Sequence, residues 1–482
     1  MRPMRAESPK QSWADDPLAT FAQKEAVLYG RHGDHGKTIK IINSKNDWEA
    51  NNVQKEGIQL GEIGIVQKRA LLSSFIGWMF DGFETSTLIL VGSAAMLSLL
   101  PDPDPDQIRV AVGTALGGTL MGWAVGGTVG SIMADYVGRK KMLMVSIVGY
   151  CAFTAFTALS QSVMMLIALR FLTGMFLGTE WSTGTALVAE TWPASARAKA
   201  LGFMQSGYGF GFFLAAGLWL LIQPYAGPEG WRLMFVIGVL PAILVIYVRK
   251  QVPESKLWLE AVASGHAGVN GEGPGRKLTL VAMFDDKDAF ATVLAVLIIA
   301  SVTVSVFYGI TALTGPYIGA IAAKQGLVAS AWASISALVY NGGSILGYMT
   351  AGFVADAIGQ KPYMFLSFLG AILSGVLMYI APQTLTVALI CVFILGVFTL
   401  GVFSWMPIYL PELFHTRVRS TAAGVIFNLA RLVAFPLPIL TAFLFSNLGG
   451  YQSTVLALTL LYVIAIIALM TLPETKGRAL PL

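Results

Sequence analysis

Long apolar segments constrain this chain more than any other feature. Twelve runs with few charges each extend for about 18 residues or more, the length that a helix needs to cross a bilayer core of about 30 Å. Charged residues make up 12% of the chain, against about a quarter in soluble domains. The pattern predicts an all-α, multi-pass membrane protein and excludes an ordinary soluble enzyme.

The predicted spans form two groups of six, separated by a polar stretch with a Gly-rich centre. We expect a polar tail at 1–68 without a signal-peptide core, a six-helix half at 69–248, a linker at 249–288, a second half at 289–472 and a tail at 473–482. The spans are expected at roughly 70–99, 110–134, 142–159, 163–189, 200–222, 231–248, 289–313, 328–355, 362–381, 385–411, 420–447 and 451–472.

Lys and Arg residues gather in alternate loops, for example at 139–141 and 249–250. The opposite loops include the acidic stretch 101–106 and the uncharged stretch 160–162. Because basic loops stay on the cytoplasmic side, the pattern predicts that both termini are cytoplasmic. We expect the plasma membrane as the location, which is the inner membrane in a bacterium.

Three short motifs recur at an interval of about 220 residues and indicate a duplicated six-span unit. Such parallel repeats are typical of transporters that bind substrate between two halves near the middle of the membrane. The motifs pair Asp135 with Asp356, Glu190 and Arg197 with Glu412 and Arg419, and Pro253-Glu254 with Pro473-Glu474.

The loop after the second span carries Gly130-x-x-x-Ala134-Asp135-x-x-Gly138-Arg139-Lys140, with a degenerate copy that contains Asp356 and Lys361. This loop is similar to the signature of the major facilitator superfamily. The resemblance implies twelve transmembrane helices in two pseudo-symmetric halves. We expect a gating network around the basic turns, with Glu190 beside Arg197 and Glu412 beside Arg419. Its residues are Gly130, Asp135, Gly138, Arg139, Lys140, Glu190, Arg197, Asp356, Lys361, Glu412 and Arg419.

Charged motifs within the spans resemble the branch of aromatic-acid and metabolite proton symporters and sugar porters. The motifs are Asp81-Gly82-Phe83-Glu84, Arg170-x-x-x-Gly174-x-x-x-Gly178, Glu180-Trp181 and Asn428-x-x-Arg431. Glu84 stands where that branch usually has a second Asp.

Asp81 lies twelve residues beyond Arg69, which places it about 18 Å into the membrane if the segment is helical. Glu84 shares a helical face with Asp81, so we expect the two carboxylates to approach each other. Ionisable residues within a membrane are usually functional, and Asp81, Glu84 and Glu180 are candidate proton carriers. The resemblance pairs Glu84 with Arg170, as a charge switch or as a static ion pair.

Arg431 is about 18 Å from Arg419 along a helix, and an unpaired guanidinium at that depth is costly. A ligand carboxylate is an attractive partner, and Asn428 could add a hydrogen bond. Pairing with Glu180 or another helix is the alternative. The other residues expected to line the cavity are Trp181, Tyr340, Asn341 and Trp405.

The sequence thus predicts proton-coupled symport of a small organic anion by alternating access, with a carboxylate as the expected class and an aromatic acid as one candidate. The alternatives are a sugar or neutral-metabolite porter, in which Arg431 is structural, and a nutrient sensor that binds ligand without transport. We expect no enzyme activity, cofactor, metal or nucleic acid, and a protein that functions as a monomer in the bilayer.

Overall fold

The structure, a computed structural model, describes residues 63–481 except 223–224, 226, 228, 265–278, 285–286, 382–383, 435–443 and 445–446. These residues belong to one compact unit, Leu60–Leu482. Every regular element in this described part is helical, and nine of its helices are long and apolar enough to span a membrane. Most of the tail expected at 1–68, and the centre of the linker, lie outside the described residues.

The first six predicted spans correspond to seven helices. The sixth span is divided in two at Pro241, which precedes the first residue of the second piece and cannot donate a backbone hydrogen bond. Two short helices follow in the linker. The helices are α2 (Ile65–Leu99), α3 (Pro105–Val137), α4 (Arg139–Ala158), α5 (Val163–Thr191), α6 (Ala194–Ile222), α7 (Gly230–Ile237), α8 (Ala242–Gln251), α9 (Lys256–Ala263) and α10 (Thr279–Ala282).

The last six spans begin close to where the apolar runs predict them, although the eleventh is described without gaps only to Ala434, and three of them differ in detail. The twelfth span is divided in two at Leu461. The seventh helix continues through Pro316 to Lys324, and the tenth span is interrupted by a π-helical turn and a 3-10 turn. The elements are α11 (Lys287–Lys324), α12 (Ala329–Ile358), α13 (Gln360–Ile380), α14 (Leu385–Leu395), η1 (Gly396–Leu400), η2 (Gly401–Ser404), α15 (Trp405–Leu413), α16 (Arg419–Ala434), α18 (Tyr451–Leu460) and α19 (Tyr462–Met470).

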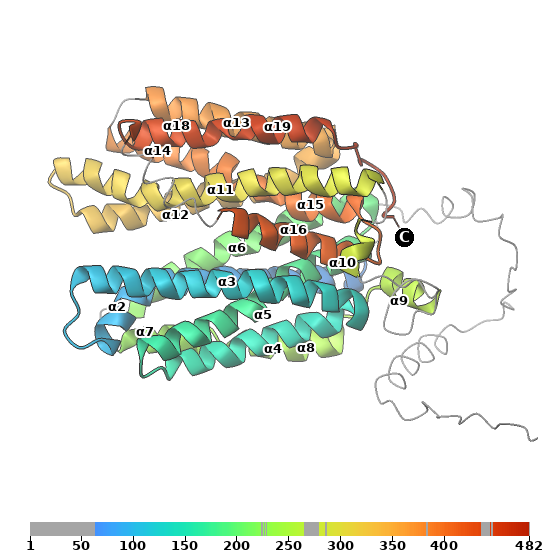
Figure 1. Cartoon of the computed structure of the whole chain (residues 1–482), viewed down its shortest axis with the longest axis horizontal. Helices are drawn as coiled ribbons and strands as arrows, with labels where there is room; N and C mark the ends of the chain where they lie inside the picture. Colours follow the sequence, from blue (N-terminus) through green and yellow to red (C-terminus); the bar gives the residue numbers. More distant parts are fainter. Residues whose placement is uncertain are drawn as a thin grey trace, which may run out of the picture. The chain divides into compact units, whose positions relative to one another are not determined.

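The helices form two groups, α2 to α8 and α11 to α19, which Figure 1 shows as a lower and an upper layer. Within the first group α3 packs on α5 and α2 on α6, and within the second α12 packs on α14 and α11 on α16. The same pairs of positions therefore recur in both groups, as a duplicated unit requires. This arrangement confirms the predicted all-α fold.

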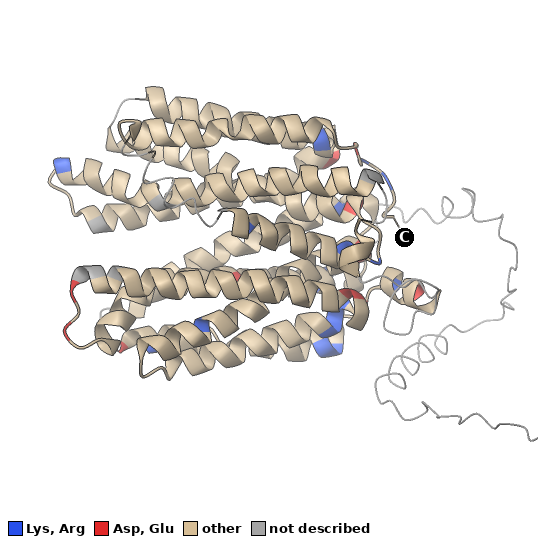
Figure 2. Cartoon of the chain, viewed as in Figure 1, with Lys and Arg blue, Asp and Glu red and all other residues tan. Residues whose placement is uncertain are grey.

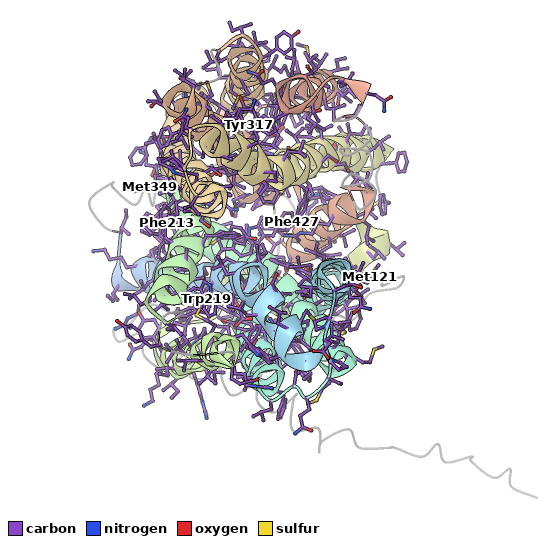
Figure 3. All side chains as sticks on the ribbon, turned by 90° about the vertical axis from the view of Figure 1, so that its left-hand side faces the viewer. Met121, Phe213, Trp219, Tyr317, Met349 and Phe427 are labelled. Carbon is purple, nitrogen blue, oxygen red and sulfur yellow. The ribbon has the colours of Figure 1, made fainter. Side chains whose placement is uncertain are left out.

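The two groups touch through α6 against α12 and α3 against α16. Small residues allow these helices to approach closely. A Cβ atom on Gly352 would lie 2.3 Å from the Ala198 carbonyl oxygen, and one on Gly424 would lie 1.8 Å from the Ser131 hydroxyl. Figure 3 shows Phe213, Met349 and Phe427 along this boundary.

Lys and Arg residues gather at one end of the bundle, on the right in Figure 2. We call this end, which contains the α3–α4 turn at Gly138 and the α12–α13 turn at Gly359, the basic end. The loop between α2 and α3, which carries acidic residues, lies at the opposite end (Figures 1 and 2).

Candidate transport site and gate

Three carboxylates lie inside the first group of helices. Asp81 and Glu84 on α2 and Glu180 on α5 are at most 2% exposed. Both oxygens of Asp81, both oxygens of Glu180 and Oε1 of Glu84 have no hydrogen-bond partner among the described residues. An ionised carboxylate buried without partners is costly, so this cluster favours binding of protons.

The expected ion pair between Glu84 and Arg170 is present, with 2.9 Å between Glu84 Oε2 and Arg170 Nη1. The Arg170 guanidinium lies 4.7 Å from the centroid of the Phe235 ring. It also donates hydrogen bonds to three hydroxyls, those of Thr154, Thr157 and Thr173. Arg170 is therefore held by four polar partners.

Asp81 lies close to Glu180 on α5 as well as to Glu84 on its own helix. Asp81 and Glu84 do interact electrostatically, but Glu84 pairs with Arg170 on the other side, and Asp81 interacts more strongly with Glu180. The expected approach of Asp81 and Glu84 is therefore consistent with the structure, and Glu180 is an additional neighbour of Asp81. Three residues along a helix turn a side chain through about 300°, which is enough to direct the two carboxylates to different partners.

Arg431 lies where α16 meets α3, and its side chain is half-buried. Its Cζ atom is 3.7 Å from the ring centroid of Phe427 and 4.2 Å from that of Trp123. Nη1 donates a hydrogen bond of 3.2 Å to Asn428 Oδ1, as expected, and the guanidinium also interacts electrostatically with Tyr308. Asp81 is close enough to interact electrostatically with Arg431.

Trp181 is the one other expected binding residue that reaches this group. Its ring centroid lies 4.3 Å from that of Phe427, and its indole N–H donates to Gln205 at 3.0 Å. The other three bond elsewhere in the second group of helices. Tyr340 pairs with Thr399, Asn341 donates to the Ala337 carbonyl, and Trp405 donates to Thr303.

Sequence reasoning missed Trp123, Phe427 and Tyr308 around Arg431. Phe427 lies four residues before Arg431, and this spacing on a helix predicts that the two side chains are neighbours. Trp123 follows Gly122 in a glycine-spaced stretch of α3. Tyr308 carries no local signal, because only the packing of α11 on α16 brings it to Arg431.

The predicted gate residues meet at the basic end. Asp135 accepts hydrogen bonds from Ser420 N at 3.3 Å and from Thr421 N at 2.8 Å and Thr421 Oγ1 at 2.7 Å. Its carboxylate therefore caps the N-terminus of α16, which belongs to the other group of helices, where a negative charge is stabilising. Arg139 Nη2 lies 3.0 Å from both Asp135 and Glu190.

The ion pairs of the two repeats are exchanged. Glu190 pairs with Arg419 at 2.8 Å, and Arg197 pairs with Glu412 at 3.5 Å. The expectation that each Glu pairs with the Arg of its own repeat is wrong. These pairs are also buried, with side chains at most 7% exposed, so they tie the two groups of helices together.

Each basic turn is capped by a glutamate that sequence reasoning did not assign. Glu254 accepts from Arg139 N at 3.0 Å and Lys140 N at 3.2 Å, and Glu474 accepts from Gln360 N at 3.1 Å and Lys361 N at 3.0 Å. Burial raises the pKa of Glu254 from its ordinary value. The repeated Pro-Glu motif was the signal for both residues.

The remaining gate residues have separate contacts. Asp356 pairs with Lys199 at 3.3 Å, and the Lys361 ammonium donates to the Leu472 carbonyl. Gly130 leaves room for Thr179, whose Oγ1 would lie 1.9 Å from a Cβ at this position. Gly138 has φ +109°, which an L side chain rarely adopts.

The fold and the charged groups that it buries define a polytopic membrane transporter. The sequence model of the family described as "Sugar (and other) transporter" matches residues 104–481. The chain belongs to this family, within the major facilitator superfamily.

Two curated relatives and one solved structure are similar to this chain. It is 26% identical over 415 residues to a probable 4-methylmuconolactone transporter of Cupriavidus pinatubonensis, with 86% of this chain and 92% of the relative covered. It is 27% identical over 384 residues to the sialic acid transporter NanX of Escherichia coli, with 80% and 88% covered. The proton:xylose symporter XylE has a TM-score of 0.70 at 18% identity, with 86% of this chain and 98% of XylE covered.

Proposed function

We propose that this transporter moves a small organic anion together with protons, by alternating access and as a monomer in the plasma membrane. The observation that carries the proposal is the placement of Arg431, a guanidinium at the boundary between the two groups of helices and within electrostatic range of the buried Asp81 carboxylate. The relatives named for 4-methylmuconolactone and sialic acid support an organic acid as cargo.

The surroundings of Arg431 favour a carboxylate ligand. Aromatic rings contact the guanidinium through Phe427 and Trp123, and one of its N–H groups is bonded to Asn428. The remaining donors of a guanidinium lie in its plane and match the two oxygens of a carboxylate. The rings of Trp123, Trp181 and Phe427 could contact an apolar or aromatic part of the anion.

Glu84 and Arg170 form the proposed charge switch for proton coupling. Protonation of Glu84 removes the ion pair and leaves Arg170 with its three threonine partners, and loss of the proton restores the pair. A proton that accompanies a monoanion also lowers the cost of moving the anion through the membrane.

The gate at the basic end supplies the second element of alternating access. Three carboxylates bond residues of the other group of helices, namely Asp135, Glu190 and Glu412. Opening this end therefore requires the exchanged pairs to separate.

Proton influx into proteoliposomes tests the proposal. The panel is benzoate, sialic acid, 4-methylmuconolactone and xylose, each added outside vesicles that contain a pH indicator. Saturable acidification with at least one carboxylate, absent with xylose and in empty vesicles, is the expected result. Acidification with xylose alone would demote Arg431 to a structural residue and favour the neutral-metabolite porter.

Binding of a carboxylate without any flux of radiolabelled ligand would instead favour the nutrient sensor. This measurement uses the same purified protein, with thermal unfolding to show that it is folded.

A further inference from the structure

We infer that Asp81 and Glu180 together hold a proton that is taken up when an anion binds at Arg431, at a site separate from the Glu84–Arg170 pair. This inference rests on the proposed function and specifies how the anion and a proton are linked.

Two helices bring these carboxylates together. Gly77 lies one turn before Asp81 on α2, on the same helical face. A Cβ atom on Gly77 would lie 1.7 Å from Glu180 Oε1, so the carboxylate of Glu180 rests against the backbone of α2 at this turn. Trp78 and Trp181, the next residues along the two helices, have ring centroids 6.2 Å apart and fix the same contact.

The pair lacks the partners that two negative charges would require. All four carboxylate oxygens have no hydrogen-bond partner among the described residues, and the two side chains belong to residues that are 0% and 2% exposed. Two carboxylates that share a buried site cannot both ionise readily, so such a pair retains a proton. The second proton is then bound or released according to the charge nearby.

Arg431 is the positive charge near the Asp81–Glu180 pair, and a bound anion neutralises it. With the site empty, one ionised carboxylate of the pair balances the guanidinium, which interacts electrostatically with Asp81. A substrate carboxylate bound to Arg431 compensates the guanidinium charge in place of the ionised carboxylate of the pair. The remaining negative charge on the pair then has no compensating cation and binds a proton.

The ionisable groups around Asp81 agree with this assignment. The helices α7 and α8 also contact α2, but Arg232 donates to the carbonyls of Ala158 and Ser160, and the basic residues of α8 lie in its last turn. The helix α3 presents the ring of Trp123 to Trp78. The groups that interact with Asp81 or with its acidic neighbours are Glu84 on α2, Tyr150 and Cys151 on α4, Arg170 and Glu180 on α5, Tyr208 on α6 and Arg431 on α16.

Proton uptake on binding tests the inference without requiring transport. Titration calorimetry of the purified full chain, with 4-methylmuconolactone or sialic acid in buffers of different ionisation enthalpy, counts the protons bound per anion. The expected value is about one proton per anion. The double variant Asp81→Asn with Glu180→Gln leaves no carboxylate in the pair and should reduce this value to near zero while an anion still binds. Glu260→Gln, on the linker helix α9, is the matched control and should keep it.

The outcomes separate the inference from the proposed function. Failure of every carboxylate to bind or to drive proton influx would overturn the proposed function, and this inference with it. Binding and proton-coupled flux with normal proton uptake in the double variant Asp81→Asn with Glu180→Gln would overturn the inference alone. Loss of uptake in Glu84→Gln but not in the double variant would assign the proton to Glu84.

Gly77→Ala provides a variant that changes no charge. The added methyl group displaces the Glu180 carboxylate, whose flexible end can move, so we expect the proton count to fall while the protein still folds. Gly217→Ala, a glycine of α6 with open space around its Cβ position, is the control. An unchanged proton count in Gly77→Ala, with the protein folded, would overturn the shared site.

Discussion

Arg431 and Glu84 illustrate two ways in which a membrane helix can hold a charge. Glu84 has a full ionic partner in Arg170, at 2.9 Å. Arg431 contacts the Phe427 ring and the Asn428 amide, and it interacts with Tyr308 and with the Asp81 carboxylate through electrostatics. A cation inside the helix bundle that lacks a direct ionic partner is stabilised most by binding an anion. This is why Arg431, and not Arg170, is the proposed anion site.

Replacement of Arg431 should weaken anion binding far more than folding. A hydrogen bond to a charged group contributes about 1.5–3 kcal/mol, so Arg431→Ala should reduce affinity by about 10-fold to 100-fold. Arg431→Lys keeps the charge but loses the planar fork, and we expect an intermediate loss. Titration calorimetry and thermal unfolding provide the two readouts. Equal losses of affinity and of stability would support a structural role.

Glu84→Gln should abolish accumulation driven by a pH gradient while sparing exchange of substrate across the membrane. The variant cannot release a proton, so the ion pair with Arg170 no longer forms and breaks during the cycle. Counterflow of radiolabelled substrate in proteoliposomes measures exchange. Full pH-driven accumulation by Glu84→Gln would remove this residue from the coupling role.

At the scale of elements, the two basic turns depend on glycines that permit an unusual backbone. Gly138→Ala should destabilise the protein for two reasons. Its φ of +109° is strained for alanine, and the new Cβ would lie 2.4 Å from Glu254 Oε2, in the cap of α4. Gly326→Ala, at φ +73° with open space, should show only the effect of backbone strain. Thermal unfolding compares them, and equal shifts would mean that the Glu254 cap adds nothing.

The exchanged ion pairs make a prediction about coupling between repeats. A double-mutant cycle of Glu190→Gln with Arg419→Gln should show a clear interaction free energy, because the two side chains are 2.8 Å apart and fully buried. The cycle of Glu190→Gln with Arg197→Gln should be close to additive, since Arg197 pairs with Glu412. Breaking a buried pair costs about 3–5 kcal/mol, which unfolding in mild denaturant can resolve. The reverse pattern would show that pairing is within repeats.

At the scale of the whole molecule, two proton sites would affect the charge that moves in each cycle. If the Asp81–Glu180 pair and Glu84 each carry a proton with one monoanion, the loaded transporter gains a net positive charge. Uptake should then rise with an inside-negative potassium diffusion potential, measured in proteoliposomes at equal pH on both sides. Uptake that does not depend on the membrane potential would mean that only one of the two sites carries a proton in each cycle.

Much of the fold could be predicted because apolar length is a local property of the chain. The limits of α4 and α13 agree with the predicted spans to within a few residues. The interruption at Gly396–Ser404 could not be predicted, since the apolar run there is continuous and the break coincides with a tertiary contact. A Cβ on Gly401 would lie 2.7 Å from the Cα of Gly347 on α12.

The sequence by itself determined the spans, the duplication, the gate motif and the charged residues within the helices, because each depends on spacing along one chain. Tertiary structure alone decided the partners. Glu190 could pair with Arg197 or Arg419, which occupy equivalent positions in the two repeats, and only packing of α16 on α5 and α3 selects Arg419. Asp81 likewise meets Glu180 because Gly77 lets α5 approach α2. Repeats with the same local pattern have the same local preferences, so contacts between them are set by the way the helices pack.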